Sequence, residues 1–156
     1  MKVEIKQMPE LHLGTIRHVG SYEQIGRAFA RLGQILGPET ALFMQHGSAM
    51  IAVYYDDPGS VPADRLRSDA AIVLPPDLAL PVGLVEQHVP AGQFGCALHV
   101  GPYEQLGEAW RRPKGEWLPA SGHQAGTGPS YEVYLNDPTT TPKPELRTEM
   151  YIPIAD

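Results

Sequence analysis

Apolar and polar residues alternate along several short segments of the chain, which is the pattern of a strand with one buried face. The clearest example is residues 94–100, in which every second side chain is apolar. A similar alternation covers residues 3–5 and resumes at residues 11–13. The remaining predicted strands, which are rich in β-branched and aromatic residues or follow such segments, are residues 50–55, 68–74, 131–135 and 147–154.

Helical spacing replaces this alternation after the first strand segment. The residues that share one helical face there are Ile25, Phe29, Leu32 and Leu36. Ser21 and Gln24 have the spacing of a capping box, which predicts the start of this helix. Gly37-Pro38 is a stop signal and predicts its end.

A second helix is predicted after Pro102, a residue that suits the first helical position. Pro113 lies inside this helix and is expected to kink or break it, because proline has no N–H for the bond one turn back. Trp110 and Trp117 are seven residues apart and are expected on one helical face. Residues 119–130 are rich in glycine, proline and serine and are predicted to form a long loop.

The chain also repeats itself. Residues 18–29 and 99–110 are identical at 8 of 12 positions, at an offset of 81. Shorter matches continue in the same order as far as residues 66–69 and 146–149. We interpret residues 1–156 as a single domain made of two copies, about 1–77 and 82–156, each reading strand, helix, strand, strand. This predicts an α+β fold with antiparallel sheets and helices on one face.

Composition narrows the classes of function. Apolar residues make up 42% and charged residues 19%, which is typical of a globular protein. The net charge is −6 with no basic stripe, so direct binding to nucleic acid is not expected. The longest aliphatic run is too short to span a membrane. The single cysteine and the absence of a secretory signal favour a reducing, cytoplasmic location.

A set of short motifs resembles the GyrI-like family, also called the AraC-type effector-binding or gyrase-inhibitor-like domain. The motifs are His99-Val-Gly-Pro-Tyr-Glu, Trp110, Trp117-Leu118, Gly128-Pro-Ser-Tyr-Glu-Val-Tyr134 and Asp137-Pro138. The resemblance covers essentially the whole chain and implies a duplicated strand–helix–strand–strand fold. Many members are the ligand-sensing part of transcription regulators and are fused to a helix-turn-helix. This chain has no room for that element, so it resembles the stand-alone members.

The resemblance implies that Glu132 lies at the base of an aromatic pocket. The repeat supports this residue, because the first copy has Ala52 at the matched position while the flanking Val and Tyr are retained. Strand alternation puts Tyr134 on the same side as Glu132. An ionised carboxylate is costly to bury without a partner, and a cationic ligand that also contacts aromatic rings would supply one. The alternative is an ion pair between Glu132 and Arg147.

Aromatic residues of the second copy are the candidates for the pocket wall. Trp117 has no counterpart in the first copy, and Tyr151 stands where that copy has an alanine. Trp110 stands where the first copy has a phenylalanine, so plain core packing is its alternative. Tyr134 is matched by a tyrosine, which favours a scaffold role equally well.

Other residues that could carry chemistry receive structural interpretations. His18 and His99 occupy matched positions before the helices and are expected to be structural. Cys96 is expected to be an inert core residue. The six histidines show no spacing typical of metal ligands, so neither a metal nor another cofactor is predicted.

Three hypotheses about function remain. The leading one is a stand-alone effector or multidrug-type binding protein for a hydrophobic, aromatic and cationic small molecule, anchored by Glu132. The family also contains hydrolases of cyclopropane-containing, DNA-alkylating compounds, and in that case Glu132 would be the general base. Other members inhibit DNA gyrase, which would make this chain a protein-interaction module. Exposed edge strands would also allow a homodimer.

Overall fold

The computed structural model describes residues 2–40, 43 and 49–155. The chain divides into two compact units. We call Met1–Pro9 together with Ala91–Asp156 the terminal unit, and Glu10–Pro90 the inserted unit. The boundaries therefore fall between residues 9 and 10 and between residues 90 and 91. Residues 78–81, which separate the two predicted copies, lie within the inserted unit.

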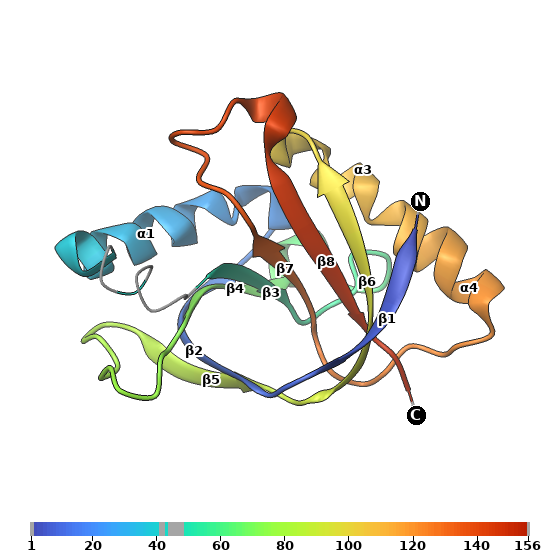
Figure 1. The fold of residues 1–156 in the computed structure, drawn as a ribbon, viewed down its shortest axis with the longest axis horizontal. Coiled ribbons are helices and arrows are strands. Elements are labelled where there is room, and N and C mark those ends of the chain that lie inside the picture. The colour runs from blue at the N-terminus through green and yellow to red at the C-terminus, as the bar shows by residue number, and fades with distance from the viewer. Residues whose placement is uncertain (1, 41–42, 44–48, 156) are drawn as a thin grey trace. The chain divides into compact units, whose positions relative to one another are not determined.

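The inserted unit is an antiparallel sheet with one long helix on its face (Figure 1). Its strands run in the order β3-β4-β2-β5. Their bounds are β2 Leu11–Val19, β3 Met50–Tyr54, β4 Arg67–Val73 and β5 Val85–Val89. Helix α1, Gly26–Leu36, packs on β2 and β4. The core between helix and sheet includes Leu32, Leu36, Phe43, Ala70, Ile72 and Leu84.

The start of α1 differs from the predicted capping box. The side chain of Ser21 makes no capping hydrogen bond. Instead, Tyr22–Gln24 forms a 3₁₀ turn in which the N–H of Gln24 donates to the carbonyl of Ser21 at 3.0 Å. A backbone turn therefore takes over the role expected of the serine hydroxyl. The predicted end is confirmed, because the helix closes at Gly37 with a φ of 47° that favours glycine.

The terminal unit has four antiparallel strands, in the order β1-β6-β8-β7. Its strands are β1 Val3–Met8, β6 Gly92–Val100, β7 Ser130–Tyr134 and β8 Arg147–Pro153. The N-terminal strand β1 thus pairs with β6, far along the chain, while β5 pairs with β2. These two pairings explain why the compact units do not follow the halves 1–77 and 82–156.

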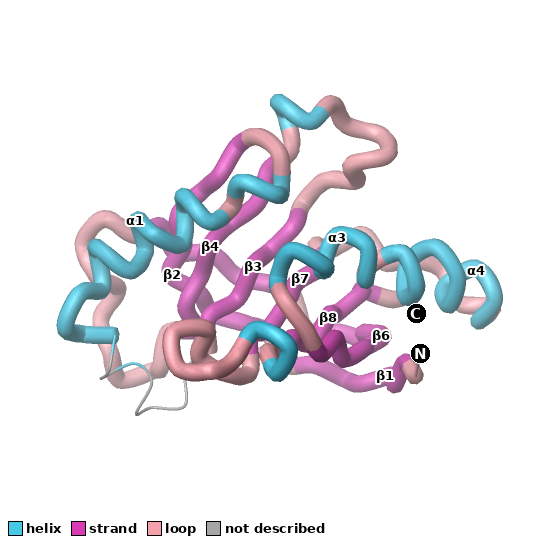
Figure 2. Tube along the Cα trace, turned by 90° about the horizontal axis from the view of Figure 1, so that it is seen from above, coloured by secondary structure: helices cyan, strands magenta, loops and turns pink. Residues whose placement is uncertain are grey.

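The second helix passes through Pro113 instead of breaking there. It begins as α3, Leu106–Ala109, widens into π-helical turns over Arg111–Trp117, and ends as α4, Leu118–Ser121. The N–H of Leu118 donates to the carbonyl of Pro113, five residues back, which is the π-helical spacing. Figure 2 shows the three segments following one another along one rod. The predicted loop is correspondingly shorter and starts after Ser121.

The antiparallel α+β class and the predicted strand positions are confirmed, whereas β5 was not predicted. Both units contain strand, helix, strand and strand in the same order, although the duplication of the sequence stays a prediction. Among the residues that the structure describes, no helix has the length and apolarity needed to cross a membrane.

Candidate functional site

Glu132 is fully buried on the helix-covered face of the terminal sheet. It lies in the middle of β7 and opposite Met150 of β8. The apolar cluster on this face is built from Met150, Ala97 and Leu106. The Glu132 residue is only 1% exposed, so the strand places a carboxylate inside an apolar layer. Such a group is costly to bury unless hydrogen bonds stabilise it.

Two aromatic side chains donate hydrogen bonds to this carboxylate. Trp110 Nε1 donates to Glu132 Oε2 at 2.6 Å, and Tyr134 Oη donates to Glu132 Oε1 at 2.9 Å. Tyr103 adds a third ring, with its centroid 5.1 Å from that of Tyr134. Burial raises the pKa of Tyr103, and the negative charges of Asp137 and Glu132 raise it further. The carboxylate therefore lies in an aromatic enclosure built from α3, β7 and the turn before α3.

Trp117 reaches the same face of the sheet at a different place. Its ring packs over Gly95 of β6, where an added Cβ would lie 3.0 Å from the ring and 3.2 Å from Val3. It also stacks on His123 with ring centroids 6.0 Å apart. Beside it lies a hollow of about 390 Å³, lined by Val3, Arg112, Glu116 and Trp117. Glycine at position 95 is what lets the indole approach the sheet so closely.

Tyr151 lies on the opposite face of the sheet from Glu132. Strand alternation in β8 sets it apart from Met150, and its ring stacks on Tyr131 with centroids 4.7 Å apart. Its hydroxyl donates to Glu149 Oε1 at 3.1 Å. The structure therefore separates Tyr151 from the other predicted pocket residues.

The same opposite face carries a polar cluster that the sequence did not indicate. Glu149 Oε2 lies 3.7 Å from both Cys96 Sγ and Lys6 Nζ. Burial raises the pKa of the Cys96 thiol, and the Glu149 carboxylate raises it further. A raised thiol pKa favours the inert role expected for Cys96, because less of the reactive thiolate is present at neutral pH. A hollow of about 530 Å³ borders this cluster, lined by Lys2, Glu4, Lys6, Cys96, Leu98, Arg112 and Glu149.

The predicted site residues thus fall into three places. Glu132, Trp110 and Tyr134 are joined by hydrogen bonds, whereas Trp117 lies over β6 on the same face. The alternative partner Arg147 is exposed and belongs to the other face of β8. Of the two matched histidines, His18 lies with Nε2 2.9 Å from the carbonyl of Ser21, which is a structural contact.

The model of the GyrI-like small-molecule-binding domain matches residues 1–155. The chain belongs to the GyrI-like family. Two relatives from this family are named DNA gyrase inhibitor. The protein of Citrobacter koseri is 27% identical, over 99% of this chain and 98% of its own length. The protein of Serratia proteamaculans is 34% identical, over 88% of each chain.

Solved structures with the same GyrI-like fold have much lower sequence identity. The C-terminal domain of EcmrR superposes with a TM-score of 0.74 at 17% identity, covering 99% of this chain and 98% of that domain. SAV2435 bound to tetraphenylphosphonium has a TM-score of 0.67 at 13% identity, covering 99% of this chain and 94% of the other. A hydrolase from Listeria innocua has a TM-score of 0.66 at 14% identity, covering 99% and 92%. At these identities the similarity establishes the fold.

Proposed function

We propose that this GyrI-like domain binds a hydrophobic, aromatic cation and that Glu132 is the anionic anchor for it. The observation that carries the proposal is the buried Glu132 carboxylate, held by hydrogen bonds from Trp110 and Tyr134 within an aromatic enclosure. The tetraphenylphosphonium in the SAV2435 structure is a ligand of the proposed class.

The chemistry of the enclosure suits a bulky monocation. A carboxylate attracts a cation strongly once both are removed from water. The rings of Trp110, Tyr134 and Tyr103 offer π-faces, and a cation over such a face gains about 0.5–2 kcal/mol. A hydrophobic cation would also bury apolar surface against Met150 and Leu106 of the same face. Charge and apolar area would therefore select the same class of ligand.

Access to Glu132 has to involve the helical rod. Glu132 is only 1% exposed and accepts a hydrogen bond from Trp110, so we infer that a ligand reaches the carboxylate by displacing this indole. Trp110 lies at the junction between α3 and the π-helical turns, and Trp117 is the last residue of those turns. π-helical turns are rare, are found mostly inside α-helices, and lie frequently at functional sites. We infer that Arg111–Trp117 is the segment that yields when a ligand enters.

The test compares a cation with a neutral molecule of similar shape. Tetraphenylphosphonium and triphenylphosphine oxide are titrated into the wild type and into E132Q, with tryptophan fluorescence and calorimetry as readouts. Loss of the anchor charge should weaken binding of the cation at least 10-fold and change binding of the neutral compound by less than about 3-fold. E108Q is the matched control, because Glu108 is an exposed residue of the same rod.

Equal affinity of the wild type and E132Q for the cation would exclude the anchoring role. An equal loss for both compounds would make Glu132 a structural residue only. The hydrolase alternative is examined in the same samples with a cyclopropane-bearing aromatic electrophile, followed by mass spectrometry. A product heavier by one water would replace the binding function with catalysis.

A second candidate function rests on the curated relatives. Both relatives compared above carry the name DNA gyrase inhibitor, and one aligns over 99% of this chain. If this chain acts in that way, purified protein should reduce supercoiling of relaxed plasmid by gyrase in proportion to its concentration. Unchanged supercoiling at a large excess of protein would remove this candidate.

A further inference from the structure

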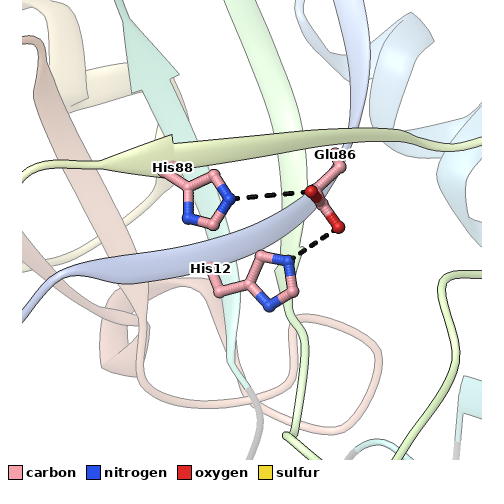
Figure 3. Close-up of side chains that lie close together, drawn as sticks. All are labelled: His12, Glu86 and His88. Carbon is pink, nitrogen blue, oxygen red and sulfur yellow. Dashed lines mark ion pairs between the residues drawn. The ribbon is translucent and has the colours of Figure 1, made fainter.

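Two histidines and a glutamate come together on the sheet of the inserted unit. His12 of β2 lies directly opposite His88 of β5 in the antiparallel register. Glu86 precedes His88 by two residues, so strand alternation turns it to the same face. Figure 3 shows both imidazole rings beside the Glu86 carboxylate. The three ligand atoms lie within 4.8 Å of one another.

The individual contacts place both imidazoles against one carboxylate. His12 Nε2 is 3.0 Å from Glu86 Oε2, and His88 Nε2 is 3.7 Å from Glu86 Oε1. The two rings are stacked, with centroids 4.7 Å apart and planes 12° apart. His12 Nε2 is shielded from solvent and makes no aligned hydrogen bond, although it faces the carboxylate. These atoms are the donors that borderline divalent metals prefer.

A fourth side chain fixes the orientation of one ring. Glu10 Oε1 lies 3.1 Å from His88 Nδ1 and can accept a hydrogen bond from the Nδ1–H group. In neutral His88 this leaves the Nε2 lone pair facing Glu86, so two acceptors confront each other across 3.7 Å. A cation between them removes this repulsion. When a histidine binds zinc through one ring nitrogen, the N–H of its other ring nitrogen usually donates to a carboxylate, a carbonyl or water. Glu10 is such a carboxylate for His88.

We propose that His12, His88 and Glu86 bind a divalent metal of the zinc class, with Glu10 orienting His88. Two histidines and one glutamate form the donor set of known three-ligand zinc sites, in which water takes the fourth position. Tetrahedral ligands around zinc are separated by about 3.4 Å, as follows from metal–ligand distances near 2.1 Å. The side chains are 42–53% exposed, so they can close the remaining distance by rotating.

The site is independent of the proposed function, because it belongs to the inserted unit and Glu132 belongs to the terminal unit. The sequence did not indicate this site, because Glu86 and His88 alone do not make a metal site. The third ligand, His12, joins them only through the pairing of β5 with β2. Metal binding there would join residues 76 positions apart, counted from His12 to His88. We therefore expect zinc to stabilise the inserted unit against unfolding.

The experiment uses the full chain without a histidine tag, after removal of metals with a chelator. Zinc is titrated by calorimetry, and binding of one equivalent with micromolar affinity is expected. H88N should weaken binding at least 100-fold and E86Q at least 10-fold. E10Q keeps all three ligands and should weaken binding about 10-fold, as loss of an outer carboxylate does elsewhere. H123N, at an exposed histidine of the terminal unit, is the matched control and should bind like the wild type.

A second readout does not depend on affinity. The melting temperature of the wild type should rise with zinc, and the rise should be lost in H88N and E86Q but kept in H123N and E132Q. Nitrogen NMR of the imidazoles should show the Nε2 resonances of His12 and His88 shifting together. Absence of saturable binding in the wild type, or equal losses in H88N and H123N, would overturn the proposal. If H88N does not fold, the zinc affinities of E86Q and E10Q relative to H123N decide whether the proposal holds.

Discussion

Among the residues that the structure describes, each unit has one fully buried carboxylate, and the two carboxylates are held by different parts of the structure. In the inserted unit Asp69 is fully buried and accepts hydrogen bonds from Arg17 Nε at 2.7 Å and Tyr55 Oη at 2.6 Å. Arg17 comes from β2, the neighbouring strand, and its guanidinium also covers the Tyr55 ring. In the terminal unit Glu132 is bound by Trp110, at the end of α3.

This difference separates a structural carboxylate from a candidate anchor. The partners of Asp69 come from β2 and from the residue directly after β3, so the pairing of the strands holds its network in place. The indole that binds Glu132 belongs to a rod that changes from α to π geometry directly after Trp110. Movement of that rod changes the surroundings of Glu132 and leaves the sheet in place. The following predictions test how far this contrast holds.

The largest effect is expected from D69N. It leaves the Arg17 guanidinium and the Tyr55 hydroxyl facing a neutral amide in a buried position. We expect a loss of about 3 kcal/mol in the free energy of unfolding, the lower end for a broken buried pair, because the Arg17 side chain is 41% exposed. Urea unfolding measures it. A loss below about 1 kcal/mol would show that Asp69 is not the support of this sheet.

A double-mutant cycle replaces Trp110 and Glu132 by the residue types at the matched positions of the first predicted copy, Phe29 and Ala52. W110F alone removes a donor from a buried carboxylate and should cost about 2 kcal/mol of unfolding free energy. The double variant W110F/E132A no longer has a buried carboxylate without its donor. It should therefore recover at least about 1 kcal/mol of the unfolding free energy that W110F loses. Urea unfolding of the four proteins gives the coupling. Additive losses would mean that the Trp110–Glu132 bond contributes little to stability.

Two glycines, Gly95 and Gly14, test the packing of Trp117 on β6. In G95A the new Cβ would lie 3.0 Å from the Trp117 ring, whereas in G14A it would meet the mobile ends of Leu84, Leu74 and Leu80 at 3.0–3.3 Å. Overpacking of this kind costs about 1 kcal/mol or more. On a W110F background only Trp117 emits, so G95A should shift the emission and G14A should not. A shift of the same size in both would contradict the close packing of Trp117 on β6.

The smallest effect is expected from D56N. Asp56 Oδ2 accepts the N–H of Arg67 at 2.8 Å, and Asn136 Oδ1 accepts the N–H of Arg147 at 3.0 Å in the other unit. An amide can therefore replace the carboxylate at this turn, and the urea midpoint at neutral pH should fall only slightly.

The pH dependence identifies the cause of that small change. The hydrogen bond from Arg67 lowers the pKa of Asp56 below its usual value of 3.8. Because its pKa is lower in the folded state, the ionised carboxylate stabilises the fold at pH values above the unfolded-state pKa. This stabilisation is lost as the pH falls through the folded-state pKa. The difference between the wild type and D56N should therefore be present at pH 5–7, decline as the pH falls below about 3.8, and disappear once the carboxyl is protonated in the folded state as well. A difference that persists in acid would point to packing instead of charge.

Local patterns predicted the strands other than β5, the end of α1 and the shared strand face of Glu132 and Tyr134, whereas the family resemblance suggested that Trp110 lies near Glu132. The local patterns predicted these features because alternation and a glycine stop are properties of neighbouring residues. The position of Tyr151 also depends on the register between β7 and β8, which alternation alone does not determine. The His12–His88 pair depends on β5 joining β2. The sequence predicts a kink or a break at Pro113, and the π-helical turns found there have no separate sequence signal.

The discontinuity of the terminal unit has a consequence for a chain that is still being synthesised. Val3–Met8 leaves the ribosome well before its partner strand, which begins only at Gly92. At usual rates of translation the intervening residues take roughly 4–17 s. Throughout that interval β1 is an unpaired strand. The charges of Lys2, Glu4 and Lys6, which alternate along it, are of the kind that prevents such a strand from pairing with another nascent chain.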